Sequence, residues 1–471
     1  QSPGSRSVAA GCSRRAAVTA QITEPGLEIS DHQRLQAVVN PAAALAIGDQ
    51  PRLLQHPQME GQLGLGEIQI AGQITDAAFT LPQLQQDPLP GGIRQGLEQA
   101  AGLIGAEPGV SGVLLHQSRL IDQNEPVNFH SPMRIGINGF GRIGRLVFRA
   151  LWGRPGIELV HVNDPAGDAV TAAHLLEFDS VHGRWDRGIS SDADGFSVQG
   201  SPLTWSSSRE ITTVPWKERG VEMVLEASGK IKTPETLNPY FNSVGLKRVI
   251  VGCPVKGEVA GEEALNIVYG INHHLYEPQR HRLITAASCT TNCLAPVAKV
   301  LNDTVGIKRG YMTTIHSYTG DQPTLDRMHK DLYRARAAAT SMIPTSTGAA
   351  KAVGLVLPEL KGKLDGTAIR VPTPNVSMVD LTFVAGRDTT VDEINAAIKE
   401  AANGPLKGVL GVCEAPLVSV DFNHNPNSST FDATQTQVMD GNFVRILSWY
   451  DNEWGFSNRM SDTAVAMAKF L

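Results

Sequence analysis

The chain has 471 residues, and 41 basic against 47 acidic side chains give it a formal net charge of -6 at pH 7. This length is enough for two or three domains with cores of their own. The acidic balance, without any basic run, argues against a nucleic-acid-binding protein, and no apolar run reaches the roughly 20 residues of a membrane span.

Five cysteines occur, at positions 12, 253, 289, 293 and 413. They lack the spacing of metal ligands and their number is odd, so we expect neither a metal site nor a disulfide framework. A reducing compartment follows, which we take to be the cytoplasm, and we expect no secretory signal.

Residues 1–132 differ sharply from the rest, because they contain no Lys, Trp or Tyr. Pieces such as residues 81–90 show neither a helical nor a strand period, and a segment without aromatic mass builds a core with difficulty. Three interpretations stay open: a disordered extension, a transit peptide, or upstream DNA translated in error. We favour a spurious or non-native extension over a functional tail, with Met133 as the natural start.

A βαβ unit follows, with a strand predicted over 134–138, a helix over 142–151 and a second strand over 158–162. The turn between the first two elements is a GxGxxG sequence, Gly139-Phe140-Gly141-Arg142-Ile143-Gly144. In such a turn the glycines allow a tight bend, a close approach of a pyrophosphate and close packing of helix on strand. The unit predicts a dinucleotide-binding domain.

Asp164 ends the second strand, about 20 residues beyond the last glycine, where an acid binds the ribose hydroxyls of the adenosine. Its carboxylate would repel a 2′-phosphate, which favours NAD over NADP. NADP stays open as an alternative, because Pro165 directly follows the acid and the positive side chain of Arg327 could bind a 2′-phosphate.

Further strands are predicted over 221–225 and 247–251, and each ends in a turn of small residues, 227–229 and 252–254. Such turns are typical of a parallel sheet in which a cofactor lies across the C-terminal ends of the strands. We interpret Cys253, in the second turn, as a packing residue.

Cys289 lies where a strand-like run, 283–285, gives way to a helix-like run, 293–301. A thiol at a helix N-terminus faces unpaired amides and the positive end of the helix dipole, which favour the thiolate. His316, downstream, offers an imidazole that could pair with it. The alternative is that Cys289 and Cys293 are two buried structural cysteines.

Long alternating segments over 310–318, 368–385 and 442–450 predict an antiparallel sheet with one covered face. Segments rich in hydroxyl and basic residues lie between the first two, over 319–322, 329–336 and 344–350.

With these motifs in hand, residues 133–471 resemble phosphorylating glyceraldehyde-3-phosphate dehydrogenases. The segments that carry the resemblance are the glycine turn, 286–295 around Cys289, 315–319 around His316, and 448–457 near the C-terminus. The resemblance implies an α/β fold, with a Rossmann-type parallel-sheet NAD-binding domain and an α+β catalytic domain with a mostly antiparallel sheet. It implies domains over 133–288 and 289–452, a C-terminal helix at about 453–471 that packs back on the first domain, and a homotetramer.

The resemblance also implies the reaction: Cys289 captures an aldehyde, His316 takes the hydroxyl proton, and inorganic phosphate cleaves the resulting thioester. Glyceraldehyde 3-phosphate and phosphate then need two anion sites. Thr319 and Arg370 are assigned to the sugar phosphate, with Asp321 orienting the arginine. The attacking phosphate is assigned to Ser288, Thr290, Arg334, Thr347 and Gly348.

The resemblance of 448–457 implies that Asn452 holds the nicotinamide carboxamide, a task that suits an amide because it offers both a donor and an acceptor. The full set of residues expected to bind the cofactor is Gly139, Gly141, Arg142, Ile143, Gly144, Asp164, Arg209, Ser228, Gly229 and Asn452.

Two other functions stay open. Residues 174–185 and 266–270 look like an arsenate-using paralogue that makes 1-arseno-3-phosphoglycerate, whereas 317–383 looks like the glycolytic or gluconeogenic branch. A non-catalytic nucleic-acid-binding role belongs to a different class, and the charge and the Cys289/His316 pair argue against it.

Overall fold

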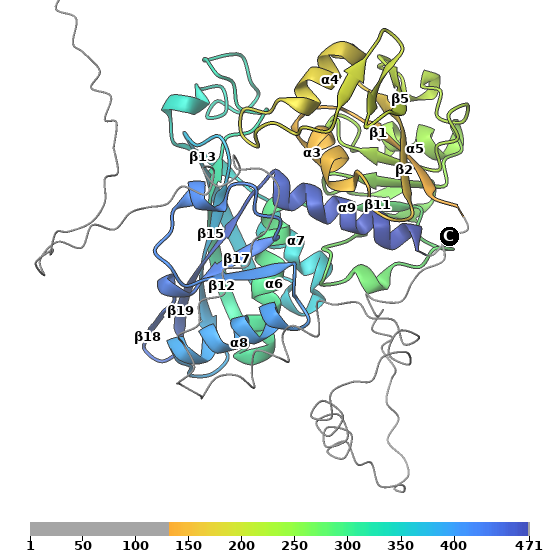
Figure 1. Ribbon diagram of the computed structural model, residues 1–471. Coiled ribbons are helices and arrows are strands. Elements are labelled where there is room, and N and C mark those ends of the chain that lie inside the picture. Colours follow the sequence, from red (N-terminus) through yellow and green to blue (C-terminus); the bar gives the residue numbers. More distant parts are fainter. Residues whose placement is uncertain (1–130, 470–471) are drawn as a thin grey trace, which may run out of the picture. The chain divides into compact units, whose positions relative to one another are not determined.

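The computed structural model describes residues 131–469 (Figure 1). The prediction that residues 1–132 form an extension falls almost wholly outside the described residues. Within the described residues, no helix is long and apolar enough to cross a membrane.

A nine-stranded sheet forms the first half, in the order β10-β11-β7-β6-β1-β2-β5-β4-β3. Its strands from β10 to β5 pair in parallel, and β4 and β3 extend it antiparallel. The strands are β1 Met133–Asn138, β2 Ile157–Asn163, β3 Ile189–Ser191, β4 Gly195–Val198, β5 Ser201–Ser206, β6 Met223–Glu226, β7 Arg248–Val251, β10 Leu265–Asn266 and β11 Leu283–Thr285. The helices are α3 Arg142–Leu151, α4 Ala169–Glu177 and α5 Pro234–Asn242, and β8 Glu258–Val259 pairs with β9 Glu262–Glu263 in a hairpin.

An eight-stranded sheet forms the second half, in the order β13-β14-β12-β15-β19-β17-β16, with β18 paired to β19. The strands are β12 Ile307–Ser317, β13 Ile343–Ser346, β14 Leu364–Val371, β15 Ser377–Ala385, β16 Leu410–Cys413, β17 Ser429–Asp432, β18 Gln437–Met439 and β19 Phe443–Tyr450. Most neighbours are antiparallel, and the exceptions are β12 with β14 and β16 with β17. The predicted fold class, a parallel-sheet domain followed by a mostly antiparallel one, is therefore confirmed.

The alternating segment over 368–385 contributes two strands to this sheet, the end of β14 and all of β15. Pro372 and Pro374 lie between them, and proline supplies no amide hydrogen for a ladder. The break lets β12 pair with β14 on one side and with β15 on the other.

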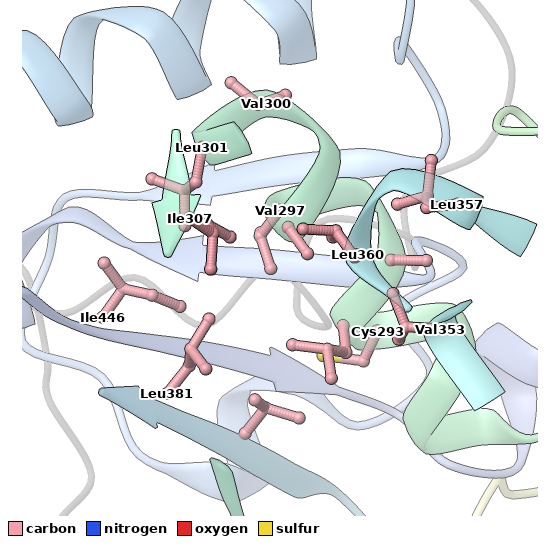
Figure 2. Close-up of a cluster of buried hydrophobic side chains, with 14 of the residues drawn as sticks. Cys293, Val297, Val300, Leu301, Ile307, Val353, Leu357, Leu360, Leu381 and Ile446 are labelled. Carbon is pink, nitrogen blue, oxygen red and sulfur yellow. The ribbon is translucent and has the colours of Figure 1, made fainter. Parts of the chain in front are cut away.

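Helix α6, Cys289–Thr304, is the central helix of the second core. Its buried apolar residues include Cys293, Val297 and Leu301, and they pack with residues of the sheet such as Leu381 and Ile446 (Figure 2). Helices α7 Ala349–Val356 and α8 Val391–Asn403 contact α6 and contribute to the same core.

Helix α9, Trp454–Ala468, belongs to a different core from the strand that precedes it. Its buried residues Phe456, Met460 and Val465 join the core of the nine-stranded sheet, and α9 contacts α3 (Figure 1). The end of the chain therefore packs on the dinucleotide half, as the resemblance implies.

Candidate active site

Cys289 is the first residue of α6, immediately after the connection from β11. Ser288 caps the helix, because its hydroxyl oxygen accepts the amide hydrogen of Thr291 at 3.1 Å. Ala287 has a φ of 55°, in the left-handed region that few residues other than glycine adopt. The half-buried Cys289 side chain packs against the cores of both sheets, so the thiol lies where the two halves of the protein meet.

His316 reaches this thiol from β12. The distance from Cys289 Sγ to His316 Nε2 is 3.4 Å. On the other side of the ring, Nδ1 lies 2.7 Å from the carbonyl oxygen of Ser317, which can only accept a hydrogen. Nδ1 also lies 2.6 Å from Arg370 Nη1, which can only donate, so its two neighbours make opposite demands and do not assign the ring hydrogen; Nε2 is the nitrogen that faces the sulfur.

The electrostatics of this pair differ from the expectation that the helix favours a thiolate. Burial raises the pKa of the Cys289 thiol, against the opposing effects of the Arg370 charge and of the hydrogen bonds with Thr290. Burial, assisted by the Arg370 charge, lowers the pKa of His316 to about 3. Both shifts favour the uncharged forms, a thiol beside an imidazole, over a thiolate–imidazolium pair.

Arg370, on β14, supplies a positive charge next to the pair. Its Nη1 lies 2.9 Å from the Ser317 carbonyl oxygen and 2.6 Å from His316 Nδ1. Its Nε is buried and has no hydrogen-bond partner among residues 131–469. A buried guanidinium with an unused donor is suited to an anion such as a phosphate ester.

The predicted pairing of Asp321 with Arg370 was wrong. Asp321 pairs instead with Arg334, with 2.7 Å between Oδ2 and Nη1. Arg334 also donates from Nε to the hydroxyl of Thr345 at 2.9 Å. The ion pair holds Arg334 in place and lowers the pKa of Asp321, whose burial acts in the opposite direction.

The hydroxyl residues assigned to the anion sites are partly engaged within the protein. Thr290 is buried, and its oxygen lies 2.9 Å from the hydroxyl of Tyr450. Thr319 donates to Gln322 through its amide at 2.9 Å, and within residues 131–469 it makes no hydrogen bond to Arg370. Thr347 accepts the amide hydrogen of Ala349 at 3.2 Å, and Gly348 is the N-cap of α7, so these two residues lie at a helix N-terminus.

Asn452 follows β19 and is buried. Its Oδ1 accepts hydrogen bonds from Ser317 at 2.8 Å and from Ser377 at 2.9 Å. These two bonds assign the oxygen and the nitrogen of the Asn452 amide. They leave Nδ2 as the donor for a carboxamide oxygen. Neither serine was identified from the sequence, because their positions next to Asn452 depend on β12, β15 and β19 being neighbours.

The glycine turn fits a dinucleotide. A side chain on Gly139, which has a φ of 90°, would place its Cβ 2.4 Å from the backbone of Ser228, and one on Gly144 would lie 2.0 Å from the carbonyl oxygen of Gly139. By contrast, a Cβ on Gly141 would meet nothing within 4 Å, so this glycine borders open space at the N-terminus of α3. That space is where a pyrophosphate approaches the backbone in such folds.

Asp164 lies beside this turn. Its Oδ2 accepts the amide hydrogen of Phe140 at 2.6 Å, and its Oδ1 accepts that of Ala166 at 2.8 Å. It lines a cavity of about 180 Å³ together with Phe140, Gly141, Arg145 and Trp205. We call this cavity the dinucleotide crevice. The carboxylate is fixed in it, at the position expected for binding ribose hydroxyls.

Arg142 is more deeply engaged than the sequence suggested. It pairs with Glu453, just before α9, and with Asp179. Its side chain therefore links the glycine turn to the C-terminal segment. Arg209, in the turn after β5, is exposed.

Tyr450 is a site residue that the sequence analysis missed. Its ring meets that of His316 edge to face, with 5.8 Å between the centroids, and its hydroxyl lies 2.8 Å from that of Thr314. The signal available was only a tyrosine at the end of a strand.

Comparison with known proteins gives the family of the chain. Residues 133–234 match the sequence model of the NAD binding domain of glyceraldehyde 3-phosphate dehydrogenase, and residues 288–452 match that of its C-terminal domain. The glyceraldehyde-3-phosphate dehydrogenase of Cereibacter sphaeroides is 60% identical over 341 residues, which cover 72% of this chain and 99% of that protein.

Two further relatives carry the same name. The protein of Xanthobacter flavus is 59% identical over 339 residues, which cover 72% of this chain and 99% of the relative. That of Geobacillus stearothermophilus is 53% identical over 336 residues, which cover 71% of this chain and 98% of the relative.

Proposed function

The chain belongs to the glyceraldehyde-3-phosphate dehydrogenase family, and on that premise we propose that it oxidises D-glyceraldehyde 3-phosphate to 1,3-bisphosphoglycerate in glycolysis or gluconeogenesis. NAD is its cofactor. The observation that carries the proposal is the contact between Cys289 and His316, 3.4 Å from Sγ to Nε2, beside the unused donor of Arg370.

The first step is attack by sulfur. The Cys289 thiol adds to the aldehyde carbon, and His316 Nε2 takes the thiol proton and passes it to the carbonyl oxygen, so that a neutral hemithioacetal forms on the cysteine and Nε2 is free again. Arg370 holds the phosphate of the substrate, because its charge has no carboxylate partner among the described residues and its Nε is free.

The second step is oxidation at the cysteine. His316 Nε2 accepts the hemithioacetal hydroxyl proton as the carbon loses hydride, and the product is a thioester on Cys289. NAD, when bound, supplies the acceptor for that hydride. Asn452 would orient the nicotinamide through its Nδ2, since Ser317 and Ser377 occupy its oxygen.

The third step regenerates the thiol. A phosphate oxygen attacks the thioester carbon, the carbon–sulfur bond breaks so that the acyl phosphate leaves, and the Cys289 sulfur takes the proton that His316 Nε2 accepted in the second step. Arg334 and the α7 N-terminus at Thr347 and Gly348 are our candidates for binding this phosphate, together with Ser288. Thr290 can bind this phosphate only if its hydroxyl gives up the contact with Tyr450.

Assembly as a homotetramer is part of the proposal. Five apolar side chains between 325 and 342 are more than 60% exposed in the single chain: Leu325, Met328, Leu332, Tyr333 and Met342. An exposed apolar surface of this kind is typical of a protein–protein interface. We also propose a cytoplasmic location, which the four free cysteines of the described residues support.

Steady-state kinetics test the proposal. We expect NADH formation that requires glyceraldehyde 3-phosphate and phosphate, with a higher kcat/KM for NAD than for NADP because Asp164 opposes a 2′-phosphate. A preference for NADP would overturn the cofactor assignment. A kcat/KM for arsenate that exceeds that for phosphate by about ten-fold or more would favour the arsenate-using alternative.

A further inference from the structure

The last residues of four neighbouring strands form a row of hydrogen-bonded side chains beneath the dinucleotide crevice. The hydroxyl of Ser206 donates to Asn163 Oδ1 at 2.7 Å. Asn163 Nδ2 donates to Asn138 Oδ1 at 2.8 Å, and Asn138 Nδ2 donates to Glu226 Oε2 at 2.6 Å. We call these four residues, which end β5, β2, β1 and β6, the strand-end row.

The row follows from strand register. Asn138 is aligned with Asn163 on one side and with Glu226 on the other, and Asn163 is aligned with Ser206. Aligned residues of parallel strands lie on the same face of a sheet. Four short polar side chains at one level can therefore hydrogen-bond to one another from strand to strand. Asn138, Asn163 and Glu226 are all at least 97% buried, which excludes water as their main partner.

Glu226, at one end of the row, and Asn163, next to the other end, each hold a turn. Glu226 Oε1 accepts the amide hydrogen of Ser228 at 2.9 Å and also its hydroxyl hydrogen. Asn163 accepts the amide hydrogen of Ser208 at 3.0 Å and donates to its carbonyl oxygen at 2.9 Å. The turns 227–229 and 207–209 are therefore fixed by side chains that lie below them.

The first of these turns presses directly on the glycine turn. A Cβ on Gly139 would approach both the nitrogen and the Cα of Ser228 to 2.4 Å, so the two backbones are in close contact. A displacement of Ser228 must therefore be transmitted to Gly139, at the start of the turn that receives the pyrophosphate.

Glu226 is suited to this task because all its partners donate. Four hydrogens converge on its two oxygens, from Asn138, from the Tyr240 hydroxyl at 2.7 Å, and from the amide and hydroxyl of Ser228. Only a carboxylate accepts on both oxygens at once, since an amide would turn an N–H group against donors on one side. The four hydrogen bonds favour the ionised form, although burial raises the pKa of Glu226.

We propose that Glu226 is a positioning residue for the cofactor: its carboxylate fixes the 227–229 turn against Gly139, and through the strand-end row it sets the affinity of the crevice for the dinucleotide. The inference rests on the NAD-dependent function only for its kinetic readout, because NAD binding is measured directly. It assigns Glu226 no contact with the reacting atoms.

The test compares Glu226→Gln with Tyr240→Phe. Both remove a hydrogen bond at a buried group, but Tyr240 contacts Oε2, away from the Ser228 turn, and so controls for loss of stability alone. We expect Glu226→Gln to raise the Kd for NAD, measured by titration calorimetry, by about ten-fold, and Tyr240→Phe to change it by less than about two-fold. For both variants kcat at saturating NAD should stay near that of the wild type.

A double variant tests the mechanism of the effect. In Asn138→Asp with Glu226→Gln, donor and acceptor exchange places: the glutamine nitrogen donates to residue 138, and its oxygen keeps both hydrogen bonds from Ser228. Asn163 still finds an acceptor at residue 138, so the row is complete again. We expect NAD affinity to return to within about three-fold of the wild type.

Two results would overturn the proposal. One is a Kd for NAD in Glu226→Gln within about two-fold of the wild type while the Tm falls, which would leave the row with a purely structural role. The other is a Tyr240→Phe variant that loses as much NAD affinity as Glu226→Gln. If Glu226→Gln does not fold, Glu226→Asp, which keeps the charge but shortens the reach, replaces it under the same criteria. Absence of turnover in the wild type with intact NAD binding would contradict the proposed function but not this inference.

Discussion

At the scale of single residues, the chemistry of the site depends on the hydrogen-bond or ion-pair partner of each polar side chain. His316 presents Nε2 to the thiol, and within the described part of the chain Arg370 keeps a buried donor and has no carboxylate partner. Asp321 could have neutralised Arg370 but is committed to Arg334. The residue types were evident from the sequence, whereas these partnerships were not, because each depends on strands that are distant along the chain.

The two cysteines of α6 should differ completely in reactivity. Cys289→Ser is expected to lower kcat by at least about 10³-fold, because a hydroxyl is a far weaker nucleophile beside the same histidine. Cys293 is fully buried, and burial raises its pKa to about 12, so iodoacetamide should leave it unlabelled. Peptide mass spectrometry after brief labelling should therefore find the label at Cys289 first.

Cys293→Ser is the matched control. A serine there can keep the contacts with Ser429 and with the Ser448 carbonyl, so most of the turnover should survive. An active Cys289→Ser variant, or faster labelling of Cys253 or Cys413, would refute the assignment of the nucleophile.

At the scale of elements, the sequence pattern predicted the bounds of helices and strands that depend on interactions between residues close along the chain. The helix over 142–151 and the strand over 283–285 were placed with the bounds that the structure has. The helix at the nucleophile begins at Cys289, four residues before the predicted run, because the Ser288 cap adds a turn that hydrophobic periodicity does not show. Pairing of β12 with β14 in parallel could not be foreseen, since nothing in either strand specifies the direction of its neighbour.

The glycine turn offers a pair of substitutions with opposite effects. Gly141→Ala should fold normally, because its Cβ meets nothing within 4 Å, but it should weaken NAD binding by about ten-fold or more by filling the space of the pyrophosphate. Gly144→Ala should instead lower the free energy of unfolding by about 1–3 kcal/mol, since its Cβ would lie 2.0 Å from the Gly139 carbonyl oxygen.

Urea unfolding and NAD titration of the two variants separate these effects. A Gly141→Ala variant that binds NAD as tightly as the wild type would mean that the open space is not the pyrophosphate site. A fully stable Gly144→Ala variant would mean that α3 and β1 can shift apart without cost.

At the scale of the whole molecule, stability should fall in acid because buried histidines must remain neutral. His161 is held between the hydroxyls of Thr204 and Ser206, and burial lowers its pKa to about 4. Its pKa in the unfolded chain is about 6.5, so its contribution is complete above that pH and is lost as the pH falls towards 4. Within this window His161 alone should cost about 1.4 kcal/mol per pH unit.

Urea unfolding at pH 7 and at pH 5 measures this slope. His161→Gln can keep hydrogen bonds to the neighbouring hydroxyls but does not titrate, so the difference in the free energy of unfolding between the two pH values should shrink. An unchanged difference would show that another group causes the acid sensitivity.

The exposed loop predicts the assembly state. Met328 is 98% exposed in the single chain, so Met328→Asp should not affect folding of the subunit but should weaken a tetramer that buries this loop. Light scattering after size exclusion should show smaller species for Met328→Asp and a tetramer for the control Lys407→Asp, an exposed position elsewhere. A tetramer that tolerates Met328→Asp would place the interface on another surface.

Removal of residues 1–132 should leave kcat and the Kd for NAD unchanged. Both family matches and every residue assigned to the site lie after that point, and Met133 opens β1, an interior strand of the sheet. Loss of activity or solubility on this truncation would show that the segment is part of the enzyme.

The packing of α9 has a consequence for how the protein is made. The dinucleotide core needs Phe456, Met460 and Val465, which the ribosome supplies only after the whole second sheet has been synthesised. During translation the core of the first half therefore stays incomplete, with part of its apolar surface uncovered. Meanwhile the second half emerges and can build its own core. The nascent chain is then most exposed to chaperones and to aggregation through its earliest strands, and the Arg142–Glu453 ion pair forms among the last contacts of the maturing protein.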